Sequence, residues 1–361
     1  MTYEIMHNET CIATISDRGR VQILNETFFP YALYLEEGTE VDTLVNNLEN
    51  FYYWCASRLL TLQRVYAKEI LNSIGATQRT TDKDRAFIAL QFHCLSLTDV
   101  FWVRAADEAL SFAEINLYSH AGDNSFVDVS LRGQAKKVAD SSEAAPDIST
   151  VGTCPKAWIY QNGYYLLKDG DAQDVAAELL ASNICDCFDV PHARYSASSY
   201  EGVPVSKVAL MTSLEYGIET REAFDIYALN HEINAERFIL ELDAHGYYMM
   251  NIIDYLTGNT DRHWGNWGLL IDNRTNQPVR LHDLIDFNRA FCAYDTIDGS
   301  VCQTHRNRSM TQREAAIEAV RENGLHELKE ADPAWFHEME SVYEMYLKRL
   351  ELLRVVSSQD S

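Results

Sequence analysis

Hydrophobic residues in the first part of the chain follow two different spacings. In residues 41–71, and again in residues 86–97, they recur with the period of a helix, which predicts two amphipathic helices. Residues 101–103, 112–118 and 126–131 are instead rich in aromatic and β-branched side chains, and the last stretch alternates between apolar and polar positions. Such stretches are typical of strands. We therefore expect an α+β N-terminal region.

A hairpin followed by a helix is the clearest pattern after that region. Residues 157–167 form two aromatic runs around Asn162-Gly163, a dipeptide that strongly favours a hairpin turn. Lys168 ends the hairpin, and Asp174 is placed to cap an Ala- and Leu-rich helix. Residues 204–211 then predict one more strand.

The last third of the chain is predicted to be mostly helical. Residues 223–256 have near-helical apolar spacing with a break at Gly246, and Asp332-Pro333 is a typical helix start. The helix after it carries an apolar stripe that we assign to the core: Trp335, Met339, Val342, Tyr346, Leu350 and Leu353. Upstream, the small, polar and charged residues 135–148 separate two densely hydrophobic regions, so we place a boundary there.

Composition limits the partners that the protein can have. The 361 residues are 47% hydrophobic, which is enough for one large domain or two domains that share a cleft. Thirty basic against 54 acidic residues give a net charge of -24, which repels nucleic acid and anionic membranes, so we predict neither as a direct partner. The N-terminal residues do not resemble a secretory signal, no stretch is apolar enough to span a membrane, and the eight cysteines are scattered. We expect a cytoplasmic protein with reduced thiols.

Residues 255–291 contain the candidate metal ligands. Two apolar runs joined by a polar turn predict an antiparallel hairpin, with Asn266 before it and Asp286 after it. A hairpin centred on Asn276 would place Asn266 opposite Asp286, so that an amide oxygen and a carboxylate converge. Oxygen ligands of this kind suit Mg²⁺, which usually completes its shell with water and substrate phosphates. An unpaired carboxylate among the apolar neighbours of Asp286 would otherwise be costly.

Asp261 lies on the loop that enters this hairpin. Five residues before Asn266, its free carboxylate can face the same space. A base beside a metal and phosphate site is what phosphoryl transfer needs. His263 is more suited to brace the loop by hydrogen bonding, because the neighbouring carboxylate already supplies the base.

The sequence here resembles the HipA-like kinase family, whose catalytic loop reads Asp-x-His-x-x-Asn and whose metal-binding Asp follows the next strand pair. Upstream, residues 149–156 (STVGTCPK) resemble the family's phosphate loop, Ser-x-x-Gly-x-Gln-x-Lys, with Cys154 in place of Gln. Residues 165–168 (YLLK) at the hairpin's end look like its nucleotide-binding strand. Residues 96–102 (SLTDVFW) are similar to a segment in the N-terminal region of some relatives.

The resemblance implies a bilobal, protein-kinase-like α+β fold of HipA type, with a β-rich N-terminal lobe and a mostly helical C-terminal lobe. We expect an N-terminal extension in residues 1–140, a nucleotide-binding core in residues 141–215 and a helical lobe with the catalytic loop in residues 216–361. The implied activity is ATP- and Mg²⁺-dependent phosphorylation of protein Ser or Thr. Relatives often act as toxins that a partner protein neutralises, so an antitoxin-type partner is implied as well.

The same resemblance assigns roles to individual residues. Lys168 would contact the α- and β-phosphates, and Glu178 would form its ion pair. The nucleotide-binding set is Ser149, Gly152, Lys156, Lys168 and Glu178, the catalytic pair is Asp261 and His263, and the metal ligands are Asn266 and Asp286. In the family a Ser in the phosphate loop can be autophosphorylated, and Ser149 occupies that position.

Departures from the family pattern leave the acceptor open. Arg262 stands where relatives often have an acidic residue, and Asp261-Arg262-His263 is closer to the loop of phosphatidylinositol 3- and 4-kinases. A lipid or small-molecule kinase is therefore one alternative, although the acidic charge weighs against lipid. A catalytically silent nucleotide-binding scaffold is another. Such scaffolds usually lack the lysine, the base or a metal ligand, and all of these are present in this chain.

Overall fold

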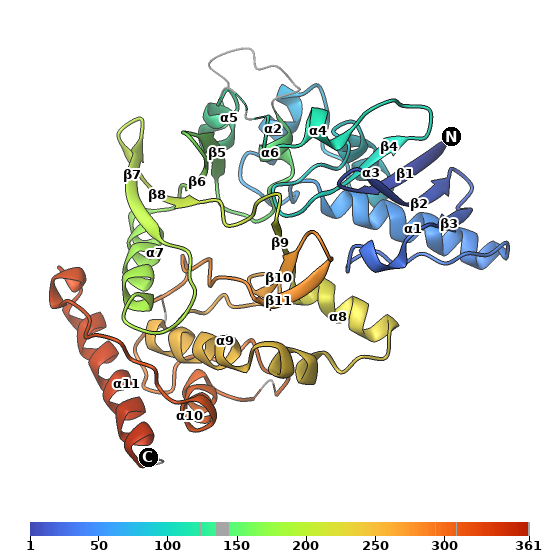
Figure 1. Cartoon of the computed structure of the whole chain (residues 1–361). Coiled ribbons are helices and arrows are strands. Elements are labelled where there is room, and N and C mark those ends of the chain that lie inside the picture. The colour runs from blue at the N-terminus through green and yellow to red at the C-terminus, as the bar shows by residue number, and fades with distance from the viewer. Residues whose placement is uncertain (121, 123, 135–143, 293, 308, 360–361) are drawn as a thin grey trace.

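Within the part of the chain that the structure describes, three antiparallel sheets and their helices follow one another (Figure 1). The structure is a computed structural model that describes residues 1–359 apart from 121, 123, 135–143, 293 and 308. The expected α+β class is confirmed, with strands concentrated before residue 221 and helices after it. Most of the expected boundary at 135–148 lies outside the described residues, and the three domain ranges stay predictions.

The N-terminal region consists of a four-stranded sheet covered by helices. The strand order is β3-β2-β1-β4, and the helices bury Phe51, Trp54 and Ile70 against the sheet. The predicted helix over residues 41–71 is interrupted, because residues 58–66 leave it as an irregular connection. The elements are β1 (Thr2–His7), β2 (Thr10–Ser16), β3 (Val21–Ile23), η1 (Glu26–Phe28), α1 (Val41–Ser57), α2 (Ala67–Ser73), α3 (Asp82–Leu90) and β4 (Phe101–Ala105).

Two of the predicted strands are short helices, so these predictions were wrong. Residues 112–118 begin as α4 (Phe112–Ile115), which starts with a capping box between Ser111 and Glu114. Residues 126–131 form most of α5 (Val127–Arg132). Both Leu131 and Ser130 of α5 are fully buried, so this helix is covered on more than one side and its apolar residues need not follow a helical period.

The middle sheet, ordered β5-β6-β8-β7, contains the predicted hairpin. β5 (Lys156–Tyr160) and β6 (Tyr164–Lys168) pair across the turn at Asn162-Gly163, where both residues have positive φ. β7 (Tyr195–Tyr200) and β8 (Val203–Ala209) complete the sheet, and α6 (Ala145–Ile148) precedes it. The following helix, α7 (Ala172–Cys185), begins earlier than expected because Asp171, not Asp174, is its N-cap.

The C-terminal part is mostly helical, as predicted. Its small sheet is ordered β11-β10-β9, with β9 (Tyr216–Thr220), β10 (Gly268–Asp272) and β11 (Gln277–Leu281). Its helices are α8 (Arg221–Asn230), α9 (Ala235–Thr257), α10 (Gln312–Asn323), η3 (Pro333–Phe336) and α11 (Glu340–Gln359). In Figure 1, α9 runs beneath the small sheet, with α10 and α11 on its far side. No helix among the described residues is both long and apolar enough to cross a bilayer.

The predicted break at Gly246 lies elsewhere. Residues 231–234 separate α8 from α9, and the kink inside α9 is at Asp243, which has φ -155°. The Asp243 carboxylate accepts hydrogen bonds from the amides of Gly246 (2.8 Å) and Leu281 (2.9 Å). The kink therefore ties α9 to the hairpin that precedes the predicted metal ligand.

The N-terminal region also contacts the turn of the β10–β11 hairpin directly. The Tyr31 hydroxyl donates to the carbonyl of Asn276 (3.0 Å), and the Asn276 amide donates to the carbonyl of Phe29 (2.8 Å). Asn276 is only 4% exposed, so these bonds are shielded from water.

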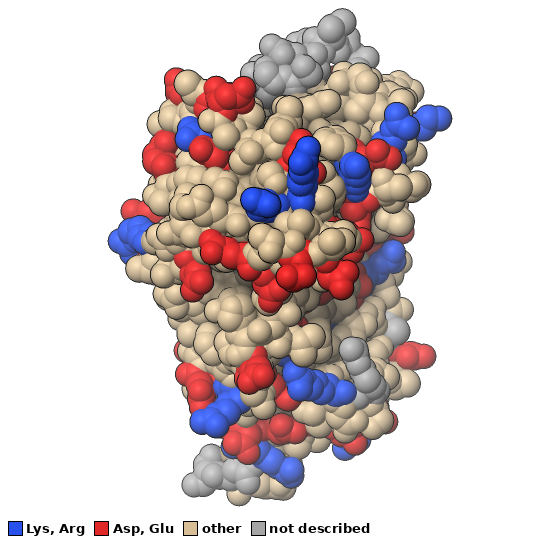
Figure 2. Space-filling model, turned by 90° about the vertical axis from the view of Figure 1, so that its right-hand side faces the viewer, with Lys and Arg blue, Asp and Glu red and all other residues tan. Residues whose placement is uncertain are grey.

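Acidic side chains are unevenly distributed over the surface. On the face shown in Figure 2, Asp and Glu form a band across the middle of the molecule, whereas Lys and Arg are more scattered. This distribution agrees with the net charge of -24.

Candidate active site

Lys168, at the end of β6, lies between two carboxylates that come from distant parts of the chain. Its Nζ is 2.6 Å from Oε1 of Glu178 on α7 and 2.9 Å from Oδ1 of Asp286 after the β10–β11 hairpin. The side chain of Glu178 is only 2% exposed, and that of Asp286 is 25% exposed. The structure thus brings together a predicted lysine, its predicted ion-pair partner and a predicted metal ligand.

The charges in this cluster hold one another in their ionised forms. Burial alone would raise the pKa of the Asp286 carboxyl, but the attraction of Lys168 and then of Lys156 outweighs it and lowers the pKa well below its usual range. For Lys168, burial is likewise opposed by Asp286 and Glu178, and the net effect raises the pKa well above its ordinary value. An ammonium between two carboxylates is the expected state at neutral pH.

Two residues that the sequence analysis missed complete this cluster. The Tyr195 hydroxyl accepts hydrogen bonds from Lys168 Nζ (3.4 Å) and from the Asp286 amide (3.2 Å). The Ser206 hydroxyl donates to the second oxygen of Glu178. Ser206 reaches this place because its position on β8 pairs with Lys168 on β6, a register that the sequence does not reveal.

The loop from Gly258 to Trp267 places Asp261 and Asn266 next to each other. The Asn266 side-chain amide donates to the main-chain carbonyl of Asp261 at 2.8 Å. Asn259, which was not predicted, accepts from the Asp261 amide (3.1 Å) and donates to the Asp286 carbonyl (3.4 Å). The loop is therefore bonded to the segment that carries Asp286.

The Asp261 carboxylate remains accessible, with 43% of its side chain exposed. Burial raises its pKa; His263 opposes this rise and Asp286 adds to it. His263 Nδ1 accepts a hydrogen bond from the amide of Gly265 at 3.0 Å, while Nε2 is 4.0 Å from the Asp261 carboxylate. His263 thus bonds within its own loop, and its bracing role stays a prediction.

The hairpin does not have the predicted register. Leu269 pairs with Leu281, so the hairpin is centred at residue 275 instead of Asn276, and a bulge follows Leu270. The strands end at 268 and 281, which leaves Asn266 and Asp286 beyond the ladder. At Asp286 φ is 61°, a left-handed conformation that Asp adopts more readily than most residues other than Gly. Loop contacts, not strand pairing, thus position both residues.

Arg262 is a structural residue of this loop. It is 1% exposed and forms an ion pair with Asp254 of α9 at 3.0 Å. Its Nη1 donates to the carbonyls of Asn266 (3.0 Å) and Ile285 (2.5 Å). The guanidinium therefore links α9, the Asp261 loop and the segment before Asp286. It is not available to bind the substrate that accepts the phosphoryl group.

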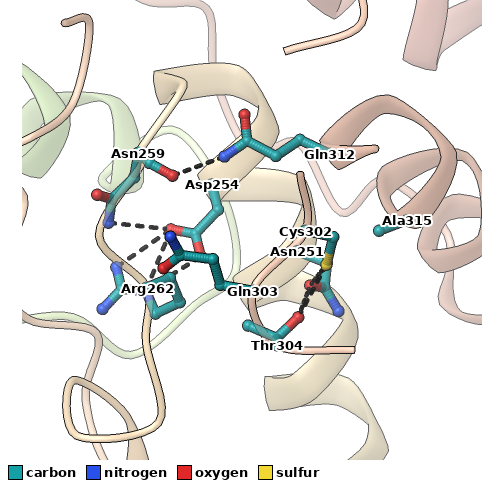
Figure 3. A pocket seen from close by; sticks show the side chains of 9 residues that line it. All are labelled: Asn251, Asp254, Asn259, Arg262, Cys302, Gln303, Thr304, Gln312 and Ala315. Atoms are coloured by element: carbon teal, nitrogen blue, oxygen red, sulfur yellow. Dashed lines mark hydrogen bonds and ion pairs between the residues drawn. The ribbon is translucent and has the colours of Figure 1, made fainter. Parts of the chain in front are cut away.

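A small cavity lined mostly by polar side chains lies behind the same loop. Figure 3 shows Gln312 of α10 pointing toward Asn259, whose carbonyl accepts from the Gln312 amide at 2.6 Å. The Gln303 amide donates to the carbonyl of Thr260 at 2.7 Å. These two glutamines fix the main chain just before Asp261, and the sequence analysis did not identify them.

The predicted phosphate loop lies beside the cluster. Lys156 Nζ donates to the carbonyl of Val151 at 3.1 Å, and burial lowers its pKa to about 8, although Asp286 opposes the shift. Gly152 has a φ of 105°, and a Cβ at this position would lie 2.3 Å from Lys156 Nζ.

Ser149 is 8% exposed, and its hydroxyl donates to the carbonyl of Pro146. The side chain of Asn288, two residues after Asp286, donates to Cys154 Sγ at 3.5 Å.

The donor set fits Mg²⁺ better than a softer metal. Among the described residues, no hydrogen bond uses Oδ1 of Asn266 or Oδ2 of Asp286, so one amide and one carboxylate oxygen are available. Two oxygen ligands leave the remaining positions of an octahedron to water and phosphate, as is usual for Mg²⁺. No group of three or more His, Cys, Asp or Glu residues in the described ranges is arranged to hold a metal by itself.

Comparison with known proteins identifies the fold. No protein-family model and no curated protein matches the sequence. The HipA chain of the Shewanella oneidensis MR-1 toxin–antitoxin complex of HipA, HipB and operator DNA matches with a TM-score of 0.53 and 13% identity, over 99% of both chains. The Helicobacter pylori proinflammatory kinase CtkA matches 57% of this chain and 94% of its own at 13% identity, with a TM-score of 0.43. Along its whole length, the chain has the fold of HipA.

Proposed function

We propose that this protein is an ATP- and Mg²⁺-dependent kinase that phosphorylates Ser or Thr hydroxyls of a protein. One observation carries the proposal: the ammonium of Lys168 is bound to both Glu178 and Asp286. A lysine fixed by a glutamate, opposite an aspartate that can hold a metal, is the arrangement that kinases use for nucleotide phosphates. The similarity in fold to HipA supports the same class of reaction.

In the proposed mechanism, Lys168 contacts the α- and β-phosphates of ATP, and Glu178 keeps its side chain extended toward them. Asn266 and Asp286 would hold Mg²⁺, which neutralises phosphate charge when bound. Asp261 accepts a hydrogen bond from the acceptor hydroxyl and takes its proton. The hydroxyl oxygen forms a bond to the γ-phosphorus, the bond between that phosphorus and the β–γ bridging oxygen breaks, and ADP leaves.

The buried position of Arg262 bears on the choice of acceptor. Its side chain is 2% exposed and bound to Asp254, so it offers no positive charge to a lipid phosphate. The similarity of Asp261-Arg262-His263 to lipid kinase loops therefore has a structural explanation that is independent of the acceptor. A protein acceptor is the better-supported choice.

The fold similarity also motivates a proposal about partners. The matched S. oneidensis structure contains HipA together with HipB and operator DNA. We extend this to a toxin-type kinase that an antitoxin-type protein neutralises. Co-purification of a chromosomal neighbour's product with the full chain, and loss of growth inhibition when both are expressed, would support this part. Growth that is unaffected by the kinase alone would contradict it.

The test is transfer of labelled phosphate from ATP to the protein itself or to lysate proteins. Asp261→Ala is expected to lower labelling by about 100-fold or more, since general-base catalysis typically contributes that much. The matched control is Asp272→Ala, which removes an aspartate at the far end of β10 that is bonded to Arg274. Equal labelling by wild type and Asp261→Ala would refute the role of Asp261. ATP binding with no transfer in either would indicate a silent scaffold instead.

A further inference from the structure

One short segment of the N-terminal region follows the phosphate loop, residues 149–156, along much of its length. This segment, residues 60–65 between α1 and α2, is called here the cradle. The Leu60 amide donates to the carbonyl of Ile148 (2.6 Å), and the Val65 amide donates to that of Thr153 (2.9 Å). The Thr61 hydroxyl donates to the carbonyl of Gly152 (3.1 Å). The cradle is therefore bonded to both ends of the stretch from Ile148 to Thr153.

Arg64 is the centre of the cradle. Its Nη1 donates to the carbonyls of Asp147 (2.7 Å) and Thr150 (3.2 Å), and its Nη2 donates to that of Lys156. Arg64 is 2% exposed, and burial lowers its pKa, which Asp147 opposes. Removing a guanidinium from water in this way lowers the stability of the fold unless well-placed hydrogen bonds offset the loss of hydration. One side chain thus bonds the segment just before the phosphate loop, the second residue of the loop and its last residue.

These contacts decide which way the loop amides point. In a trans peptide the carbonyl of one residue and the amide of the next point in opposite directions. Because the carbonyls of Thr150, Gly152 and Thr153 point toward the cradle, the amides of Val151, Thr153 and Cys154 point away from it. Among the described residues, no hydrogen bond engages these three amides. Successive free amides turned to one side form an anion-binding concavity.

We propose that the cradle presets the phosphate loop for the phosphates of ATP, with Arg64 as a positioning residue that never touches the nucleotide. The inference rests on the proposed function and adds a role for the N-terminal region. It predicts that Arg64 matters for ligands with phosphates and not for adenosine, because the side-chain hydrogen bonds of Arg64 go to residues 147, 150 and 156, which lie in the phosphate loop or just before it.

The experiment measures binding of ATP with Mg²⁺ and of adenosine by titration calorimetry on the full chain. Arg64→Lys keeps a charge but has one donor group in place of a fork, so it cannot reach all three carbonyls. We expect its Kd for ATP to rise about tenfold or more, since one charge-assisted hydrogen bond corresponds to roughly that factor, with the Kd for adenosine unchanged. Thr61→Val is the milder variant, with an expected rise of about threefold in the Kd for ATP alone.

Arg104→Lys is the matched control, because Arg104 bonds Glu4 and Leu110 within the N-terminal region and does not touch the phosphate loop. It should bind both ligands like wild type. If Arg64→Lys does not fold, Thr61→Val decides the question. Suppose that the wild type binds ATP more tightly than adenosine. Variants that keep this preference, or whose affinity for adenosine falls as much as their affinity for ATP, then overturn the proposed role of the cradle and leave the proposed function intact. A wild type that binds neither ligand overturns the proposed function and the cradle with it.

Discussion

Replacing Lys168 by Met tests the charge cluster in a way that depends on pH. The substitution keeps most of the side-chain volume and removes the ammonium from between Glu178 and Asp286. Loss of the ammonium destabilises the Glu178 carboxylate more than that of Asp286. Only 2% of the Glu178 side chain is exposed, whereas the Asp286 side chain, at 25%, can still be hydrated in part. Breaking a buried pair by removing one partner typically lowers the free energy of unfolding by about 3–5 kcal/mol.

The size of this loss has a ceiling that can be calculated. Each ion pair at 2.6–2.9 Å is worth about 6 kcal/mol at an effective dielectric constant of about 20, before desolvation offsets most of it. A buried carboxylate that has lost its cation can instead take up a proton. For a carboxyl of ordinary pKa near 4.3 this costs about 1.4 kcal/mol per pH unit, or about 3.7 kcal/mol at pH 7 and about 1 kcal/mol at pH 5. We therefore expect a loss of about 3–4 kcal/mol at pH 7 that shrinks by about 2–3 kcal/mol at pH 5.

Proton linkage explains why the loss of stability is larger at higher pH. The folded variant would bind a proton that its unfolded chain does not, so its stability falls as pH rises, whereas the wild-type cluster stays ionised over this range. Urea unfolding of both proteins at pH 5, 6 and 7 gives the difference directly. Lys207→Met is the matched control on the neighbouring strand β8, where the Lys207 ammonium bonds Gln161 and lies over the Tyr165 ring, so its loss should change stability by about 1 kcal/mol or less. A loss that is the same at all three pH values, or below about 1 kcal/mol at pH 7, would refute the reasoning.

Three further predictions concern the loops around this cluster. Gly152→Ala places a Cβ 2.3 Å from Lys156 Nζ at a positive φ, so calorimetry should show a Kd for ATP raised about tenfold; unchanged binding would contradict it. Gln312→Leu removes the donor to the Asn259 carbonyl, and steady-state kinetics should show kcat lowered about tenfold with the KM for ATP unchanged; a changed KM alone would argue against a role at Asp261. Because burial lowers the pKa of Lys156 to about 8, ATP affinity should fall as pH rises through 8, while this group's contribution to stability rises from pH 8 toward 10.5; Lys156→Met should remove both trends.

The parts of the fold that sequence predicted well have local causes. The hairpin at Asn162-Gly163 was predicted because its turn requires positive φ, which that dipeptide adopts easily. Residues 126–131 were predicted wrongly because their alternation reflects burial on several sides of α5, a tertiary property. The hairpin centre was wrong by one residue because the strands first pair at Asp272 and Gln277, which centres the turn between residues 274 and 275, and the bulge after Leu270 then moves the centre of the outer pairs to 275.

The candidate site divides in the same way. Asp261, Asn266 and Asp286 were identified because their side chains have the chemistry that phosphoryl transfer needs. Arg64 and Gln312 were missed because each acts mainly through main-chain carbonyls. Arg262 was noted, but its structural role was missed because its partners Asp254, Asn266 and Ile285 come together only in the fold. Any residue has a carbonyl, so the partner positions carry no signature in the sequence, and such contacts become visible only when the fold is known.

These main-chain contacts give the N-terminal region a direct part in the geometry of the site. It bonds the phosphate loop through Arg64 and the β10–β11 turn through Tyr31, and these two places lie on opposite sides of Lys168 in the sequence. Lys168 reaches Asp286 only if the middle sheet and the hairpin keep their present distance. Because the N-terminal region is bonded to both the phosphate loop and the turn, it limits that distance from outside the cluster. Removing the side-chain amide of Asn276, which anchors the turn, should therefore loosen the Lys168–Asp286 contact without changing either residue.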